Sequence, residues 1–294
     1  MSSTRHAQRG YPSLLLEGPS EAIDVAIGEL FQQGCLGLET VDDTARLRAY
    51  FPPGTDLGAL REALTLRFAN VRVGPIETIS EQDWVALSRK DWSGCALGER
   101  FFVCPTWEPA PLVAESPRIV LRIDPEQAFG TGRHDTTRLC VELLERCAGR
   151  GGRAIDVGTG TGILAMAAAA LGCRPVVAIE MDPAAAACAW ENAKRNRLDA
   201  SIEILSSDLE DVAPVPAGLL VANLHRPLLD RELGRLGGWL APQGLMILSG
   251  MTVHDVDEFA GLLEALPQHI KLIRYHTAGE WAALLAQSPA QPER

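Results

Sequence analysis

The stretches of this sequence that could do chemistry centre on a glycine-rich turn. The segment AIDVGTGTGIL places Gly158, Gly160 and Gly162 between a run typical of a strand and a run typical of a helix. Glycines at such a junction allow a tight turn, and they let the backbone approach a ligand at the positive end of the helix. The segment therefore predicts a small-molecule site.

The spacing of these glycines distinguishes two classes of ligand. A dinucleotide fingerprint reads G-x-G-x-x-G, but here Ile163 occupies the third glycine position and Gly162 comes one residue early. This spacing, with Asp156 two residues ahead of Gly158, is typical of class I S-adenosylmethionine-dependent methyltransferases. Their donor has no pyrophosphate, so the turn must accept a sulfonium amino acid and a ribose. A nicotinamide-dependent oxidoreductase is excluded by the same spacing.

Polar side chains end the next three strand-like runs. Glu180 ends VVAIEMD, where a carboxylate can accept hydrogen bonds from both ribose hydroxyls. Glu180 could instead cap the next helix, but Asp182, just before Pro183, suits that role better. Asp208 ends ILSSD, where this fold class often holds an acid facing the adenine, although a solvated loop acid fits as well. Asn223 ends LLVAN, the fourth strand, whose carboxyl end faces the methyl donor.

The residues after Asn223 concern the methyl acceptor. A methyltransferase acting on the amines of nucleic-acid bases would show Asn-Pro-Pro followed by an aromatic residue. This chain has Leu224, His225 and Arg226, and its proline is displaced to Pro227. The sequence therefore counts against a base as substrate.

Periodicity predicts the elements that position these residues. Residues 12 to 79 show the order βαββαβ, which is that of a ferredoxin-like α+β domain. Residues 80 to 100 carry a solitary helix, SEQDWVALSRKDW, which we interpret as a linker. Residues 101 to 294 hold apolar strands that alternate with helices and a closing pair of strands, HIKLIRYH and EWAALLAQ, which suits an edge hairpin. We expect an α/β domain with a Rossmann-like seven-stranded sheet there.

Composition narrows the class of protein. The chain has 294 residues, 47% of them hydrophobic, and a net charge of −11, which opposes binding to a nucleic-acid backbone and favours a basic partner. The longest apolar run, ILAMAAAALG, is too short to span a bilayer, and MSSTRHAQRG is no secretory signal. The seven cysteines are scattered and form no C-x-x-C pair, so we expect no metal site and a reducing, cytoplasmic location.

The chain as a whole resembles the PrmA-type methyltransferases of ribosomal protein L11. The resemblance extends over the predicted ferredoxin-like domain, the linker helix with DW, the AFGTG-x-H-x-TT element, the glycine turn, VANL and a closing EW strand. The stretch AFGTGRHDTT, at 128 to 137, is its most specific part.

The resemblance implies a substrate, a methyl donor and a separate role for each domain. The N-terminal domain would recognise L11, as the free protein. The C-terminal domain, acting as a monomer, would move methyl groups from S-adenosylmethionine to its α-amino group and lysine side chains. Thr137, the second threonine of HDTT, would contact the donor, while Gly158, Glu180 and Asn223 match the first motif glycine, the ribose acid and the strand-four asparagine.

The first glycine turn and the helix after it have predicted roles within this resemblance. The turn at 128 to 132 would close the donor site opposite DVGTGTG, so that two turns make one pocket. Thr136 or Asp135 would cap the helix that follows, and Leu139, Leu143, Leu144 and Cys147 would form its buried face. His134 fits a structural hydrogen bond better than a general base, and no catalytic residue is assigned.

Two departures from the family pattern leave alternatives open. Glu180 replaces the usual aspartate, which should preserve ribose binding, and NLHRPLL replaces the commoner NILAGPL, which alters the acceptor wall at His225 and Arg226. A paralogue that methylates lysines of another protein is therefore the alternative. A third reading, an inactive module whose N-terminal domain binds RNA, needs aromatic residues on the central strands, and only Tyr50 and Phe51 are candidates.

Overall fold

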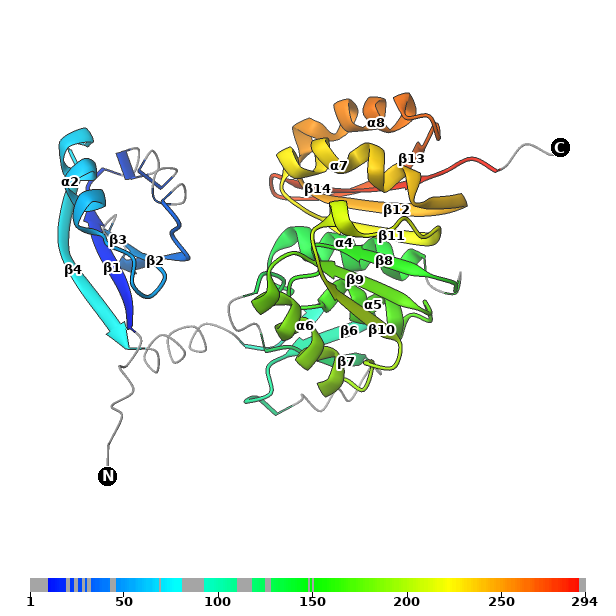
Figure 1. Ribbon diagram of the computed structural model, residues 1–294, viewed down its shortest axis with the longest axis horizontal. Coiled ribbons are helices and arrows are strands. Elements are labelled where there is room, and N and C mark those ends of the chain that lie inside the picture. The colour runs from blue at the N-terminus through cyan, green and yellow to red at the C-terminus, as the bar shows by residue number, and fades with distance from the viewer. Residues whose placement is uncertain are drawn as a thin grey trace. The chain divides into compact units, whose positions relative to one another are not determined.

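The computed structural model divides the chain into two compact units, Met1–Trp92 and Ser93–Arg294 (Figure 1). It describes residues 10–19, 22–23, 26–27, 30, 33–42, 46–68, 70–80, 93–109, 118–124, 128–147, 149 and 151–290. The linker helix predicted from residue 80 onward lies, apart from Ser80, outside the described residues. The two units are described separately below.

The N-terminal unit is an antiparallel sheet with helices. Its strands are β1 (Gly10–Glu17), β2 (Gly37–Asp42), β3 (Arg46–Tyr50) and β4 (Arg72–Ser80), in the spatial order β2-β3-β1-β4. Helix α2 (Gly58–Arg67) precedes β4, and residues 22, 23, 26, 27 and 30 are helical between β1 and β2. Leu14 and Leu16 of β1 pack with Leu60 and Leu64 of α2 in one apolar core. The ferredoxin-like prediction is confirmed.

The central strands of this unit offer no stacking platform for RNA bases. The aromatic residues on the described parts of β1 and β3 are Tyr11 and Tyr50, and their exposed fractions are only 5% and 4%. Phe51, the residue after β3, is completely buried. Because an RNA-reading sheet stacks bases on exposed rings, the structure argues against the RNA-binding alternative.

The C-terminal unit is built on a seven-stranded sheet with the order β10-β9-β8-β11-β12-β14-β13 (Figure 1). Strands β8 (Ala154–Val157), β9 (Val176–Glu180), β10 (Ile202–Ser206), β11 (Ala217–Asn223) and β12 (Leu240–Thr252) are parallel. Strand β14 (Trp281–Gln287) lies antiparallel to both β12 and β13 (Lys271–Ala278). The predicted edge hairpin is confirmed, because β13 is the outermost strand and pairs antiparallel with β14. The two residues between these strands leave room only for a tight turn.

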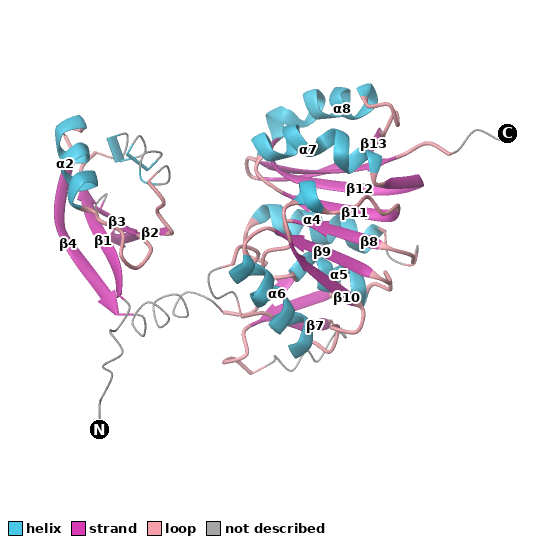
Figure 2. Cartoon of the chain, in the orientation of Figure 1, coloured by secondary structure: helices cyan, strands magenta, loops and turns pink. Residues whose placement is uncertain are grey.

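Helices cover both faces of this sheet (Figure 2). Met246 and Leu248 of β12 belong to a core cluster with α7 (Arg226–Gly238) and α8 (Val256–Ala265). Ser249, the next residue, is also buried but lies outside that cluster, as do the buried residues of α4 (Asp135–Arg146), which contacts β12. Alternate residues of a strand point to opposite faces, so α4 lies across the sheet from α7 and α8. The predicted apolar face of α4, including Leu139, Leu143, Leu144 and Cys147, is buried.

The remaining elements complete the C-terminal unit. Helix α5 (Ile163–Ala170) follows β8, and α6 (Pro183–Arg195) follows β9. Two short 3-10 helices, η1 (Leu209–Asp211) and η2 (Val253–Asp255), follow β10 and β12. A separate sheet of β5 (Cys95–Leu97), β6 (Phe101–Cys104) and β7 (Ile119–Arg122) precedes the first glycine turn.

Candidate functional site

A cavity of about 560 Å³ lies at the carboxyl ends of the parallel strands. Its wall includes a residue at or just beyond the end of each of four strands, namely Val157, Glu180, Ser207 and Asn223. Trp281, the first residue of the antiparallel β14, reaches the same edge. Ligands of open α/β sheets bind at this edge, so the cavity is the candidate active site.

The two glycine turns form one wall of this cavity. The backbone N–H of Thr161, in the second turn, donates to the Phe129 carbonyl at 2.9 Å, and its hydroxyl donates to the Gly130 carbonyl at 2.5 Å. Gly160 has φ +55°, and a Cβ atom there would collide with the Phe129 carbonyl. Ala128 and Phe129 line the cavity together with Gly158 and Gly160. The prediction that two turns make one pocket is confirmed.

Glu180 holds the second turn and faces the cavity. One carboxylate oxygen accepts the Gly160 N–H at 3.0 Å, and the other accepts the Asp182 N–H at 3.1 Å. A carboxylate oxygen can accept more than one hydrogen bond, so both oxygens retain capacity for a ligand's hydroxyl groups. Asp182 caps α6 by accepting the Ala184 N–H at 2.9 Å, as predicted.

Asp208 lines the adjacent part of the cavity. Its carboxylate also accepts the Glu210 N–H at 3.0 Å and so caps η1. The side chain is half-buried. Its position therefore combines a capping role with a place on the cavity wall, whereas the alternatives from the sequence were an acid facing the adenine and a solvated loop acid.

Asn223 is oriented by two threonines of α4. Its amide nitrogen donates to the Thr136 hydroxyl at 3.2 Å and to the Thr137 hydroxyl at 3.4 Å. The amide oxygen is thereby directed away from both threonines. Asn223 and Thr136 line the cavity, while Thr137 is completely buried behind them. The structure thus places Thr136, and not the predicted Thr137, at the wall.

His134 caps α4, so the prediction of Thr136 or Asp135 as the cap is wrong. The helix begins at Asp135, which puts His134 in the capping position, where Nδ1 accepts the Thr136 N–H at 3.3 Å. Asp135 instead pairs with Arg138 at 2.7 Å. The structural role preferred for His134 is confirmed.

Three rings stand together at one end of the cavity. The imidazole of His134 lies edge-to-face between Phe129 and Trp281, with ring centroids 5.6 Å and 5.1 Å away. The Phe129 side chain is 59% exposed. Sequence reasoning missed both aromatic residues as site residues, although FGTG and EW were noted as motifs.

The altered wall after Asn223 contains only one of the two residues flagged by the sequence. His225 lines the cavity. Arg226 instead forms ion pairs with Asp230 at 2.9 Å, Asp255 at 2.6 Å and Glu258 at 3.0 Å, and its guanidinium stacks on the Phe259 ring. Arg226 therefore ties the start of α7 to η2 and α8.

Asp156 lies beneath the second turn. One oxygen accepts the Thr159 hydroxyl at 2.6 Å and the Ala165 N–H at 2.9 Å, while the other is buried with no partner among the described residues. Burial raises the pKa of this carboxyl to about 6, although the two hydrogen bonds oppose the shift. Asp156 therefore fixes the turn against α5.

Two absences concern the described part of the chain. It contains no group of histidine, cysteine, aspartate and glutamate side chains arranged to hold a metal ion. It also contains no helix of the length and apolarity needed to cross a membrane.

The fold and the site together define a class I S-adenosylmethionine-dependent methyltransferase. The sheet has five parallel strands and an antiparallel strand inserted beside them. The glycine turn after β8 and the acid at the end of β9, Glu180, line the same cavity. The family model of ribosomal protein L11 methyltransferase (PrmA) matches residues 19–289. The chain belongs to this family.

Individual relatives agree with the family match. The chain is 35% identical over 260 residues to the ribosomal protein L11 methyltransferase of Pelotomaculum thermopropionicum, covering 85% of this chain and 82% of that protein. It is also 35% identical over 266 residues to that of Geobacter metallireducens, with 85% of each covered. A crystal structure of ribosomal protein L11 methylase from Lactobacillus delbrueckii subsp. bulgaricus is similar with a TM-score of 0.62 and 28% identity, covering 67% of this chain and all of that one.

Proposed function

We propose that this protein transfers methyl groups from S-adenosylmethionine to amino groups of ribosomal protein L11, both its N-terminal α-amino group and lysine side chains. The observation that carries the proposal is the extent of the family match. It spans residues 19–289, and so most of the ferredoxin-like unit as well as the methyltransferase fold. A donor-binding fold alone would leave the acceptor open.

The cavity fits the donor. Gly158 and Gly160 line the cavity close to the amino end of α5, where their backbone would accept the amino-acid part of the donor. Glu180 would accept the ribose hydroxyls, and Asp208 would face the adenine. Thr136 would stand near the methionine end, with Thr137 supporting it from behind. The bound donor supplies an activated methyl group on a sulfonium.

The acceptor amine would enter past the three rings. A lysine side chain has an apolar stem that could pack on the rings of Phe129 and Trp281, which line the cavity, and the amide oxygen of Asn223 can accept an N–H of the amine. The amine must lose its proton, against a pKa of about 10.4 in water, and transfer from water into this cavity lowers that value. Alignment and desolvation therefore replace a dedicated base in this proposal.

The other assignments belong to the same proposal. Residues 1–79 would read the substrate, residues 80–100 would connect the units, and residues 101–294 would carry the transferase. The substrate would be the free ribosomal protein in the cytoplasm, bound by one copy of this chain without contact to nucleic acid. The net charge of −11 supports a basic protein as partner.

The test is methyl transfer from radiolabelled S-adenosylmethionine to purified L11, with label positions mapped by mass spectrometry. Gly158→Arg serves as the blank, because its side chain would project into the donor cradle. We expect label on the N-terminus and on lysines with the wild type, and none with the variant. Donor binding without any labelling of L11 would contradict the substrate assignment and favour the alternative, lysine methylation of another protein.

A further inference from the structure

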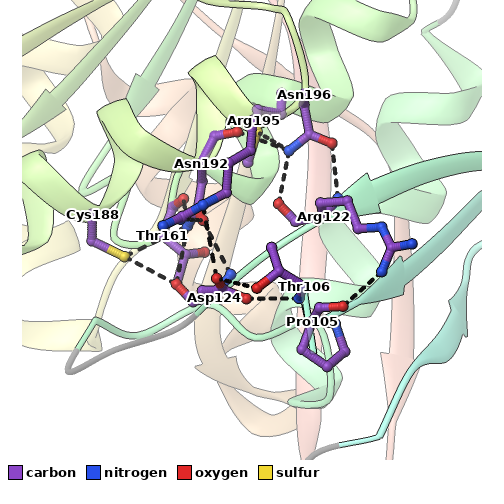
Figure 3. Close-up of polar contacts among 10 residues, drawn as sticks. Pro105, Thr106, Arg122, Asp124, Thr161, Cys188, Asn192, Arg195 and Asn196 are labelled. Atoms are coloured by element: carbon purple, nitrogen blue, oxygen red, sulfur yellow. Dashed lines mark hydrogen bonds and ion pairs between the residues drawn. The ribbon is translucent and has the colours of Figure 1, made fainter. Parts of the chain in front are cut away.

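Asn192 of α6 and Asn196, the residue that caps the end of this helix, cover an edge of the small sheet with their side-chain amides (Figure 3). The Asn196 amide accepts the Arg122 N–H at 2.8 Å and donates to the Arg122 carbonyl at 2.8 Å. The Asn192 amide accepts the Asp124 N–H at 3.0 Å and donates to the Asp124 carbonyl at 3.3 Å. Each amide thus pairs with one residue of the chain as a neighbouring strand would.

The spacing of the two asparagines explains why both pairs form. Asn192 and Asn196 are four residues apart in a helix, which separates them by about 6 Å along the axis. Arg122 and Asp124 are two residues apart in extended chain, which separates them by a little over 6 Å. Ile123, between them, donates its N–H to the Cys104 carbonyl of β6 on the opposite edge. The spacing of the asparagines along the helix therefore matches the spacing of Arg122 and Asp124 along the extended chain, so α6 holds the end of β7 in place.

Only one of the two asparagines also contacts the second glycine turn. The Asn192 amide nitrogen donates to the Thr161 carbonyl at 3.0 Å, and Asn192 is completely buried. Thr161 holds Phe129 and Gly130 of the first glycine turn through the hydrogen bonds given above. The further contacts of the Asn196 side chain go to Met166 and to the backbone of α6.

We infer that Asn192 is a positioning residue for methyl transfer, which sets the distance between the two glycine turns and hence the width of the donor pocket. It joins the end of β7, four residues before Ala128, to Thr161 of the opposing turn. Asn196 makes the equivalent pair with β7 but does not act on the pocket. The inference rests on the proposed donor site.

The two asparagines provide a matched experiment. Asn192→Ala and Asn196→Ala in the full chain each remove one amide pair with β7, and thermal unfolding measures what each costs in stability. Binding of S-adenosylhomocysteine, measured by calorimetry, reports on the pocket. We expect Asn192→Ala to weaken binding about tenfold or more and Asn196→Ala to change it less than about twofold, because a wall displaced by a fraction of an ångström loses several ligand contacts at once. In steady-state assays Asn192→Ala should raise KM for the donor and leave KM for the acceptor unchanged.

Further variants keep the test decisive. If Asn192→Ala does not fold, Asn192→Asp retains the volume and the oxygen that accepts the Asp124 N–H, and it removes the donor to the carbonyls of both Thr161 and Asp124. Thr161→Val, which removes the hydroxyl bond to Gly130, should be non-additive with the Asn192 change in a double-mutant cycle of binding. Equal effects of the Asn192 and Asn196 variants on binding would overturn the inference. A wild type that fails to bind S-adenosylhomocysteine would instead contradict the donor site itself.

Discussion

The amide nitrogen of Asn223 donates to the hydroxyl of Thr136 at 3.2 Å, joining residues 87 positions apart in the chain. This contact fixes which end of the amide faces the cavity. A carbonyl oxygen presented there can accept a hydrogen bond from an amine, whereas the amide's NH₂ would donate to the amine's lone pair, which must be free for methyl transfer. The start of α4 therefore determines what the end of β11 can bind.

Asn223→Ala should lower kcat by roughly 10²-fold, because the amine loses its alignment with the donor methyl group. The affinity for S-adenosylhomocysteine should fall by much less. Thr136→Val, which removes the hydroxyl that orients the amide, should lower kcat in the same direction, and Thr137→Ser, which keeps its hydroxyl, should not. Initial rates with saturating donor measure these effects. A loss confined to donor affinity would contradict the acceptor role.

Gly160→Ala should abolish donor binding, because the added methyl group collides with the Phe129 carbonyl and separates the two turns. Gly279→Ala is the control. Gly279 has φ +54°, nearly that of Gly160, but the nearest atom to a Cβ there is 3.9 Å away. Backbone strain alone therefore costs both variants about 1 kcal/mol of stability. Calorimetry with S-adenosylhomocysteine separates them, and equal binding by the two would contradict the role of the close contact.

His134→Asn should retain both stability and most activity, because asparagine is a good capping residue and can accept the Thr136 N–H. His134→Ala should lower the free energy of unfolding by about 1 kcal/mol. The pH profile of kcat checks this interpretation. If His134→Asn removed a limb of the profile, the imidazole would be acting as a base instead.

Arg226→Ala should reduce the thermal midpoint while leaving KM for the acceptor unchanged, since the guanidinium is bound to Asp255, Asp230 and Glu258 outside the cavity wall. His225→Ala should change KM for the acceptor with little effect on stability. Unfolding and kinetic measurements on both variants show which of the two residues affects binding of the acceptor and which affects stability. A kinetic effect of Arg226→Ala without loss of stability would reverse the assignment.

Ionisation of Asp156 should lower stability as the pH rises. Its pKa is about 6 in the folded protein and 3.8 in the reference state, so between these values the unfolded chain has lost the proton that the folded chain keeps. The free energy of unfolding therefore decreases across this window, by an upper limit of about 3 kcal/mol, and then stays level. Asp156→Asn has no such charge to bury. The thermal midpoint of the wild type should decrease relative to that of the variant as the pH is raised from 4 to 7. A constant difference between the two midpoints would contradict the prediction.

Sequence reasoning located the parts of the site that depend on local order. The residues concerned lie at or shortly beyond the carboxyl ends of parallel strands, which meet at one edge whatever the details of packing. They are Gly158, Gly160, Glu180, Asp208 and Asn223. The predicted sheet followed from periodicity, the second glycine turn from its motif, and the place of the first glycine turn from the family resemblance. Their roles toward the donor stay predictions.

The parts that were missed depend on register and on strand insertion. Capping rules that favour aspartate and threonine misplaced the start of α4 by one position or more. Thr137 was predicted from the family resemblance, and its contact with the donor stays a prediction, while the structure puts Thr136 at the cavity wall. Trp281 joins the site only because β14 lies between β12 and β13. Asn192 contacts Asp124, which lies 68 residues away in the chain, through side-chain pairing that leaves no periodic signal.

The reversed direction of β14 has a practical consequence for handling the protein. Its first residue, Trp281, lines the cavity at the carboxyl ends of the parallel strands. Its last residue, Gln287, pairs with Leu245, toward the amino end of β12. The chain after β14 therefore departs on the side remote from the cavity. A fluorophore or an immobilisation tag joined after Ala290 would leave the mouth of the pocket open, so binding could be followed on a surface-tethered sample without masking the site.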